Sequence, residues 1–216
     1  MMDYILIDLD GTLTNPKEGI TKSVQYALRS KNVFIDDLDS LTKHIGPPLR
    51  EGFMKFYGFT EEEAEEVVEK YREYYREQGI NENEVYDGIE SLLTRLKQAG
   101  KYLIVATSKP EEFAIKVLES FHLDHYFDDI CGATLDGSRD NKEAVIRYAL
   151  EKNSITALDR VVMVGDRKFD VLGAKAFGIA SIGVLYGFGS EEELVEAGAD
   201  RIAATVDEVY DIIINL

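Results

Sequence analysis

Two aspartates separated by one residue follow a short apolar run near the start of the chain. The run covers residues 4–8, and Asp8-Leu9-Asp10-Gly11-Thr12 stands at its end. In an extended chain, residues two apart point the same way, so Asp8 and Asp10 would project together from a strand end. Gly11 then permits a sharp turn. This pattern suits a catalytic pair, and a simple Asp-Gly turn is the alternative.

A second pair of carboxylates, Asp166 and Asp170, follows the apolar run at residues 161–164. Residues four apart share one face of a helix, so we expect both side chains on one face of the helix that begins here. Acids repeated at strand ends indicate a metal site. The alternative is an N-cap aspartate followed by an acid in the first helical turn, where the helix dipole favours negative charge.

Hydroxyl and amino groups follow two further strand-like segments. Thr107-Ser108-Lys109-Pro110 comes after residues 102–106, with Pro110 suited to a first helical turn and Ser108 to an N-cap. A helix N-terminus that carries a hydroxyl can bind phosphate, and plain helix capping explains the same residues. Lys142 stands in the first turn of a predicted helix, where its charge opposes the helix dipole. Such a local conflict hints at function.

The elements that must position these groups alternate along the chain. Short runs rich in Ile, Val and Leu predict buried strands, and helical spacing of apolar residues lies between the runs. The strands are expected at residues 4–8, 102–106, 129–133, 161–164 and 179–184. This alternation predicts an α/β fold, a doubly wound parallel sheet with a Rossmann-like core. All four groups would then meet at the edge of the sheet where such folds bind ligands.

Residues 14–84 contain no convincing strand and predict a small helical cap domain inserted after the first strand. A capping box at Thr60 and Glu63 begins a helix expected over residues 61–78. The α/β catalytic core would comprise residues 1–13 and 85–216.

We expect substrate recognition from residues of both predicted domains. Arg50 lies near a helix start, where a cation is disfavoured unless it meets an anion. It would bind a distal carboxylate or phosphate of the substrate with a two-pronged hydrogen bond, and a solvated surface arginine is the alternative. His44, close to Pro47, is a second candidate in the cap. Ser108 and Lys109 are the substrate-binding candidates in the core.

Composition limits the partners of this chain. Its net charge is −17 over 216 residues. Nucleic-acid polymers and anionic membrane surfaces need clustered Lys and Arg, so neither is expected as a partner. There is no basic leader and no apolar run of membrane-spanning length, which favours a cytoplasmic protein. The single cysteine, Cys131, has apolar neighbours and is expected to be a buried core thiol.

The candidate groups form one coherent chemical set. Two like charges about 4 Å apart repel by ~4 kcal/mol at an effective dielectric of 20, so clustered carboxylates cannot hold a phosphate without cations. Lys142 supplies one positive charge. Mg²⁺ suits carboxylates, waters and a phosphate oxygen. The sequence therefore predicts Mg²⁺-dependent phosphoryl transfer with a small phosphate ester as substrate.

The order of these motifs resembles the haloacid dehalogenase-like superfamily of phosphatases, and within it the phosphoglycolate phosphatase branch. The motifs are Asp8-x-Asp10-Gly11-Thr12, then Thr107 or Ser108, then Lys142, then Gly165-Asp166-x-x-x-Asp170. The resemblance covers the whole chain. One departure is that Lys142 is followed by Glu143, where a proline is frequent in the family.

The resemblance implies a role for each residue. Asp8 would attack phosphorus to give an aspartyl-phosphate, and Asp10 would first protonate the leaving group and then activate water. Asp8, the backbone carbonyl of Asp10 and Asp166 would hold Mg²⁺, with Asp170 as an indirect ligand. Thr107 or Ser108 and Lys142 would bind the transferring phosphoryl group.

Several functions share these residues. The substrate would be phosphoglycolate-like or a nucleoside monophosphate, as for a 5′-nucleotidase, and a monomer is expected. A phosphomutase resembling β-phosphoglucomutase would use the same core. A dehalogenase of the superfamily would lack Asp10, and a phosphonate hydrolase would need a cap lysine, for which Lys43 and Lys55 are available. A phospho-accepting receiver module and a dinucleotide site at residues 187–189 fit the spacing less well.

Overall fold

Residues 2–216 are described by a computed structural model, in which the chain divides into two compact units. The first unit runs through Asn15 and continues from Val85 to Leu216, and the second unit is Pro16–Glu84. The sequence predicts this first division two residues earlier, after residue 13. None of the described helices is both long and apolar enough to cross a membrane.

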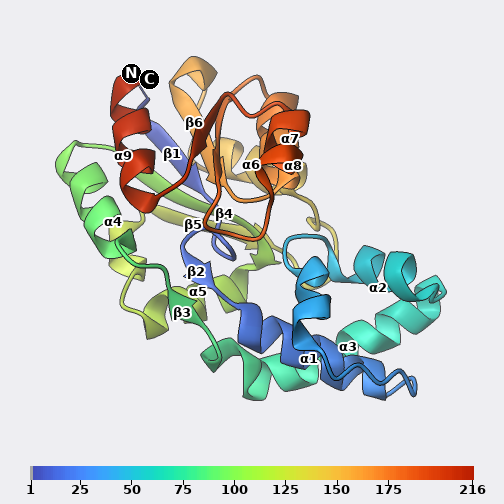
Figure 1. The fold of residues 1–216 in the computed structure, drawn as a ribbon. Helices are drawn as coiled ribbons and strands as arrows, with labels where there is room; N and C mark the ends of the chain where they lie inside the picture. Colours follow the sequence, from blue (N-terminus) through green and yellow to red (C-terminus); the bar gives the residue numbers. More distant parts are fainter. Residues whose placement is uncertain (1) are drawn as a thin grey trace. The chain divides into compact units, whose positions relative to one another are not determined.

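The first unit is built on a six-stranded sheet in which every pair of neighbouring strands is parallel (Figure 1). The order is β5-β4-β1-β6-β7-β8. The strands are β1 (Tyr4–Ile7), β4 (Tyr102–Pro110), β5 (Asp129–Ala133), β6 (Val161–Gly165), β7 (Ala180–Val184) and β8 (Arg201–Ala203). This sheet confirms the predicted α/β fold. The strand β8 was not predicted, because three residues are too few to show an apolar run.

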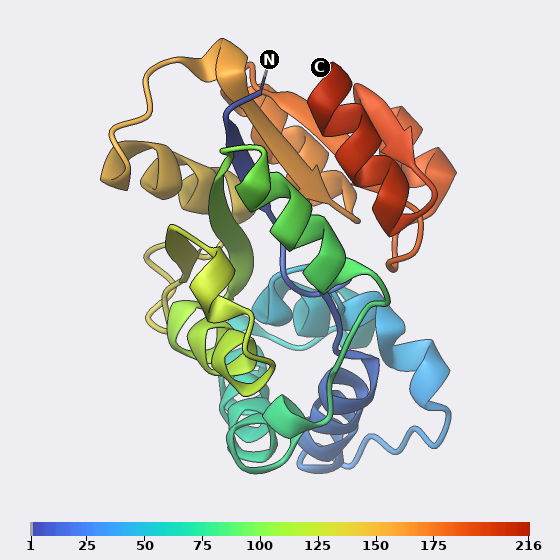
Figure 2. The same cartoon turned by 90° about the vertical axis from the view of Figure 1, so that its left-hand side faces the viewer.

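Helices cover both faces of this sheet, as a parallel sheet requires. Figures 1 and 2 show α4 and α9 together on one face, with α6 and α7 on the other. The helices are α4 (Ile89–Gln98), α5 (Glu111–Ser120), α6 (Lys142–Lys152), α7 (Lys168–Ala176), α8 (Glu191–Ala197) and α9 (Val206–Asn215). Beneath α6 and α7, Leu6, Ile104 and Met163 of the sheet pack against Val145 and Ile146 with no exposed surface. Fully burying a side chain of this size stabilises the fold by roughly 1.5–3 kcal/mol.

The central strand β1 lies between β4 and β6, and this arrangement brings the motif ends together. Ile7 at the end of β1 is in register with Val105 of β4 and Val164 of β6. The residues that follow these three positions therefore emerge side by side at the carboxyl edge of the sheet. This is the position at which open α/β sheets bind their ligands.

The second unit is helical. It contains α1 (Lys17–Arg29), the 3-10 helix η1 (Leu38–His44), α2 (Leu49–Tyr57), α3 (Glu61–Glu77) and η2 (Gly79–Asn81). The predicted capping box of α3 is confirmed: the Glu63 amide donates to Thr60 Oγ1 at 3.2 Å, and the Thr60 amide donates to the Glu63 carboxylate at 2.9 Å. The expected absence of strands in residues 14–84 is wrong in one detail. The two-residue strands β2 (Thr14–Asn15) and β3 (Glu84–Val85) pair with each other, and strands so short show no periodicity.

His44 is buried in an aromatic cluster of the second unit. The side chain is 2% exposed, and its ring centroid lies 5.0 Å from that of Phe53, 5.1 Å from Phe56 and 5.7 Å from Tyr57. Nε2 lies 3.4 Å from the Tyr57 hydroxyl, and Nδ1 has no hydrogen-bond partner among the described residues. Burial, aided by the charge of Lys43, lowers the pKa of His44 to about 4. The imidazole is therefore neutral at pH 7.

This burial predicts an acid-sensitive fold. Between pH 6.5 and about 4 the unfolded chain binds a proton at His44 that the folded chain does not, so stability falls as pH falls through this window. We expect a loss of about 2–3 kcal/mol between pH 7 and 4.5 from this residue. His44→Phe should remove that part of the loss, as measured by urea unfolding at both pH values. The exposed His125 gives the control, His125→Gln, and equal pH dependence in wild type and His44→Phe would contradict the prediction.

Candidate active site

The first motif leaves β1 in a tight turn. The strand ends at Ile7, and the amides of Thr12, Leu13 and Thr14 all donate to the carbonyl of Leu9, at 3.2, 2.9 and 3.0 Å. The Asp8 amide still donates to the Val164 carbonyl of β6 at 2.9 Å, so the turn begins after Asp8. Asp8 is 6% exposed, and its Oδ1 accepts a hydrogen bond from the Leu9 amide at 2.8 Å.

Lys142 is the cation at the centre of the acidic groups. It is the first residue of α6, as predicted, and its Nζ lies 2.9 Å from Asp8 Oδ1 and 2.8 Å from Asp170 Oδ1. The ammonium group also donates to the carbonyl of Ala106 at 2.9 Å. Burial disfavours its charge, but Asp170 and Asp8 outweigh that effect and raise the pKa of Lys142. One lysine thus links the residue that follows β1, the middle of β4 and the first turn of α7.

Asp166 follows β6 and is completely buried. Its Oδ2 accepts a hydrogen bond from the Phe188 amide at 2.7 Å, whereas Oδ1 has no partner among the described residues. The predicted placement of Asp166 and Asp170 on one helix face is wrong. Helix α7 begins at Lys168 with Arg167 as its N-cap, so only Asp170 belongs to the helix, because the turn after β6 needs two residues.

Three of these carboxylates form a cluster. Asp8, Asp166 and Asp170 each offer an oxygen within 4.8 Å of the others, and all three are buried. Burial, together with Asp170 and Asp8, raises the pKa of Asp166 well above its usual range. Burial also raises the pKa of Asp170 to about 6, against the opposing effect of Lys142. Both shifts arise first from burial, and neighbouring carboxylates add to them.

The cluster fits a divalent cation. With Asp10, the site holds four carboxylates against the two ammonium groups of Lys109 and Lys142, so −4 + 2 leaves two uncompensated negative charges when all are ionised. The buried Asp166 Oδ1 without a partner is a vacant oxygen ligand. An all-oxygen set of this kind matches the preference of Mg²⁺. The residues therefore fit the metal that the sequence predicted.

The third motif lies in a strand rather than at a helix start. Helix α5 begins at Glu111 with Pro110 as its N-cap, so the predicted capping by Ser108 is wrong. β4 extends through Pro110 instead, with a register shift between Thr107 and Pro110. Thr107 is 1% exposed and its Oγ1 accepts from the Lys109 amide at 3.2 Å. The half-buried Ser108 hydroxyl has no recorded partner within residues 2–216.

Lys109 and Asp10 form a buried ion pair, in which Lys109 Nζ contacts Asp10 Oδ2. Their side chains are 4% and 14% exposed. Burial raises the pKa of Asp10, although Lys109 opposes the shift. Lys109 thus meets a carboxylate of the first motif rather than standing free for an anion.

The two cap candidates, Arg50 and His44, belong to the second unit. The Arg50 guanidinium contacts Glu61 at 3.1 Å and Glu65 at 3.2 Å on α3, and its side chain is 38% exposed. His44 lies in the aromatic cluster described above. Their roles in substrate binding stay predictions.

Glycines make the close packing around Asp166 possible, a role that was not predicted from the sequence, where Gly11 was expected only to permit a turn. A Cβ at Gly187 would lie 2.3 Å from the Gly11 carbonyl oxygen and 2.4 Å from Asp166 Cβ. A Cβ at Gly189 would lie 1.9 Å from the Asp166 carbonyl oxygen, and one at Gly11 would lie 2.2 Å from Asp166 Oδ2. The Gly187-Phe188-Gly189 run was the available signal. It wraps the second acidic motif instead of binding a dinucleotide.

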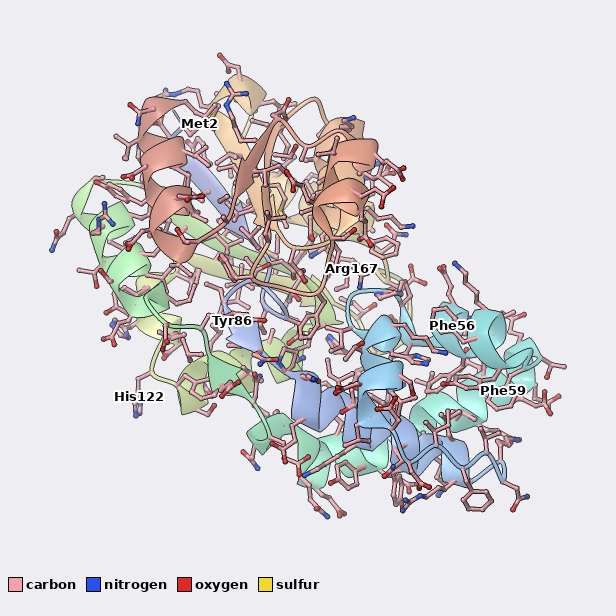
Figure 3. All side chains as sticks on the ribbon, in the orientation of Figure 1. Met2, Phe56, Phe59, Tyr86, His122 and Arg167 are labelled. Atoms are coloured by element: carbon pink, nitrogen blue, oxygen red, sulfur yellow. The ribbon has the colours of Figure 1, made fainter. Side chains whose placement is uncertain are left out.

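The segment between Asp166 and Asp170 is held from outside by Glu193 of α8. Arg167, labelled in Figure 3, donates from Nε to Glu193 Oε1 at 2.9 Å, and the Lys168 amide donates to the same oxygen at 2.9 Å. Asp170 Oδ2 accepts from the Arg167 amide at 3.0 Å. Away from the site, Cys131 is buried in β5, which confirms the predicted buried core thiol, and burial raises the pKa of that thiol to about 12.

Known proteins resemble this chain over nearly its whole length. A family model described as haloacid dehalogenase-like hydrolase matches residues 5–184. A 5′-nucleotidase of Pseudomonas aeruginosa is 50% identical over 190 residues, which are 88% of this chain and 86% of that protein. The tyrosine-protein kinase PtkA of Mycobacterium tuberculosis is 38% identical over 209 residues, 96% of this chain and 71% of the kinase. A crystal structure of a phosphatase from Clostridium acetobutylicum, described as predicted, superposes with a TM-score of 0.98 at 51% identity over 100% of both chains.

The packing at Gly187 predicts the effect of a single methyl group. Gly187→Ala should displace Asp166 or the Gly11 turn, and because a shift of about 1 Å can cost ~100-fold in rate, phosphatase activity should fall on the order of 100-fold. Gly178→Ala is the matched control, since its Cβ meets nothing within 4 Å although its φ is 65°. That variant should lose some stability and keep its activity. Initial rates with p-nitrophenyl phosphate compare the activity of both variants with wild type. A Gly187→Ala enzyme with wild-type activity would contradict the argument.

Proposed function

The chain belongs to the haloacid dehalogenase-like hydrolase family and is a phosphoric monoester hydrolase, and we propose that it hydrolyses 5′-nucleoside monophosphates with Mg²⁺ as cofactor. The observation that carries the proposal is Asp8, buried at the end of β1 and paired with Lys142 beside two further carboxylates. The 50% identity to a 5′-nucleotidase supports the substrate class.

In the proposed reaction, Asp8 is the nucleophile. Its carboxylate oxygen forms a bond to phosphorus while the ester P–O bond breaks, which gives an aspartyl-phosphate and an alkoxide leaving group. Asp10 donates a proton to that alkoxide. It then takes a proton from the water that attacks the aspartyl-phosphate, so that phosphate is released and Asp8 is restored. The raised pKa of Asp10 supports its use as the acid in the first step.

The proposed Mg²⁺ would be held by Asp8, Asp166 and the Asp10 backbone carbonyl, with Asp170 behind them. When bound, it would neutralise charge on the transferring phosphoryl group. Lys142 keeps Asp8 and Asp170 together through its two ion pairs. The Phe188 amide donates to Asp166 Oδ2, and Oδ1 has no hydrogen-bond partner among the described residues and is available to a metal.

We assign the phosphoryl oxygens to the hydroxyls of the third motif and to lysine. Ser108 has a hydroxyl available, Thr107 is buried beside it, and Lys142 lies within reach of Asp8. Lys109 would also bind the phosphoryl oxygens if its ammonium group left Asp10 for the phosphate. For the leaving group, Arg50 and His44 of the second unit stay the proposed contacts. A phosphomutase would use the same core residues, and phosphoglycolate is the alternative substrate.

The decisive experiment measures phosphate release from a panel of monoesters. We expect nucleoside 5′-monophosphates to give kcat/KM at least about 10-fold above phosphoglycolate and hexose phosphates, since one lost charged contact is worth roughly this much. Asp8→Asn should abolish turnover with an unchanged circular dichroism spectrum, because an amide cannot attack phosphorus. Transfer of phosphate from ATP to a tyrosine peptide without release from any monoester would refute the proposal, as would an active Asp8→Asn variant.

The metal assignment predicts strict dependence on Mg²⁺. Exhaustive chelation should remove activity and Mg²⁺ should restore it, whereas Ca²⁺ should restore little, because it prefers more ligands at longer distances. Mg²⁺ should also raise the melting temperature, since a ligand that binds only the folded state stabilises it. Potassium chloride at equal ionic strength is the control. Full activity in the chelated enzyme would exclude a metal requirement.

A further inference from the structure

The residues proposed to bind phosphate are carried by an irregular segment of β4. Pairing between β4 and β5 is regular up to Thr107 and Gly132, and then shifts so that Pro110 lies beside Ala133. Ser108 and Lys109 occupy the shifted stretch. A bulge of this kind re-aims side chains at a strand end, but it leaves backbone groups without their ladder partners. Something outside β4 has to hold the bulged segment in place.

Gly132 of β5 is the point at which the bulged segment is held. A Cβ at this position would lie 2.7 Å from the Lys109 carbonyl oxygen and 2.6 Å from Glu111 Cα, so the two backbones are in direct contact. The Gly132 amide donates to Glu111 Oε2 at 3.1 Å. The side chain at the start of α5 therefore takes the place of a ladder partner for β5.

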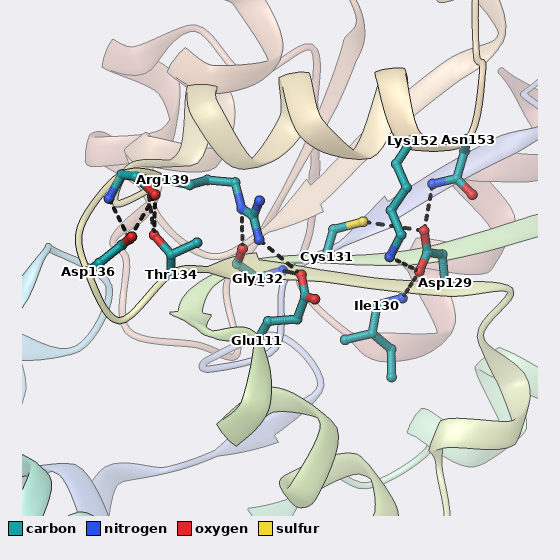
Figure 4. A network of polar contacts seen from close by, with 11 residues as sticks. Glu111, Asp129, Ile130, Cys131, Gly132, Thr134, Asp136, Arg139, Lys152 and Asn153 are labelled. Carbon is teal, nitrogen blue, oxygen red and sulfur yellow. Dashed lines mark hydrogen bonds and ion pairs between the residues drawn. The ribbon is translucent and has the colours of Figure 1, made fainter.

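Arg139, in the loop that precedes Lys142, contacts both Gly132 and Glu111 (Figure 4). Its Nε donates to the Gly132 carbonyl at 2.7 Å, and its Nη2 contacts Glu111 Oε2 at 3.2 Å. The guanidinium plane lies over the ring of Tyr148 on α6, 3.6 Å from the centroid. The Arg139 and Glu111 side chains are 18% and 28% exposed, which reduces solvent screening of the pair.

The charges and the geometry both require an arginine here. Its planar fork reaches a backbone carbonyl and a carboxylate at once while its face stacks on Tyr148, and lysine has one charged nitrogen and no plane. Arg139 stands three residues before Lys142, and its own amide donates to Thr134 Oγ1 at 3.0 Å. The same side chain thus ties the bulge with Ser108 and Lys109 to the loop that begins α6.

We propose that Arg139, with Glu111, is a positioning residue that holds the bulge at residues 107–110 and the start of α6 in one arrangement for binding the phosphoryl group. The inference rests on the proposed phosphate site. Arg139 does not touch the reacting atoms, and it acts through Gly132, Glu111 and the segment that carries Ser108 and Lys109.

The test compares Arg139→Ala with Arg139→Lys and with Arg147→Ala. Arg147 lies on the same helix as Lys142, is 55% exposed and pairs only with Glu143 among the ion pairs described, so it is the matched control. Isothermal titration with inorganic phosphate and Mg²⁺ measures binding directly. We expect Arg139→Ala to lower the affinity for phosphate by about 10-fold or more. The affinity of Arg139→Lys should lie between those of Arg139→Ala and wild type, and Arg147→Ala should bind phosphate as wild type does.

Hydrogen–deuterium exchange supplies a readout of position. In Arg139→Ala, exchange should accelerate in peptides covering residues 106–111 and 130–134, where the Lys109 and Gly132 amides make side-chain hydrogen bonds, and stay unchanged in β6 and β7. Phosphate affinity within two-fold of wild type would overturn the proposal. So would faster exchange throughout the first unit, which marks a general loss of stability. If Arg139→Ala does not fold, Arg139→Lys and Glu111→Gln are judged by the same two criteria.

The proposed function can fail independently of this inference. If wild-type enzyme releases phosphate from no nucleotide, the substrate assignment is wrong, while titration with inorganic phosphate still decides the role of Arg139. If wild-type enzyme does not bind inorganic phosphate in the presence of Mg²⁺, the positioning role is wrong as well.

Discussion

The structure depends on one electrostatic constraint: carboxylates are concentrated where water cannot reach them. Asp166 and Asp170 are at most 1% exposed, and Asp8 is 6% exposed. Buried acids normally escape repulsion by taking up protons, which is the direction of the pKa shifts of Asp166 and Asp170. Lys142 counters part of the repulsion through Asp8 and Asp170. Among the described residues no ion pair to Asp166 is found, although the charge of Arg167 opposes the rise of its pKa, and its Oδ1 has no hydrogen-bond partner, which supports the proposed cation.

The acids differ in their partners: three of them pair with one of two lysines, and the fourth accepts a hydrogen bond from a backbone amide. Asp8 and Asp170 share Lys142, Asp166 accepts from a backbone amide, and Asp10 pairs with Lys109. Where surroundings give neighbouring titratable groups different pKa values, those groups can take different roles as acid and nucleophile. The sheet supplies the positions, because the ends of β1, β4 and β6 are adjacent. The glycines supply the space, since side chains at these positions would occupy the volume of the carboxylates.

The features of the fold and site that could be predicted from the sequence are those with a local sequence pattern. Buried parallel strands appear as apolar runs, and Lys142 was found from its conflict with the helix dipole. Capping preference gave a wrong prediction at Ser108, because the register shift that places Ser108 in β4 depends on pairing with β5, a contact between distant segments. Contacts between distant segments, such as Gly187 with Gly11, leave no periodic signal. A lone glycine or arginine acquires meaning only when the fold brings its partner beside it.

If the core residues bind only the phosphoryl group, as proposed, discrimination among esters must come from groups beyond them. Of the two candidates in the second unit, the physics favours Arg50. Its pairs with Glu61 and Glu65 are between partly exposed side chains, and such pairs are worth roughly 0–1 kcal/mol, so exchange for a substrate anion costs little. His44 is enclosed by aromatic rings and held neutral, so presenting it as a cation would first require overcoming its burial. The buried neutral imidazole of His44 is placed to fix the shape of the aromatic cluster, so we propose Arg50 rather than His44 as the residue that would exchange its partners for a substrate anion.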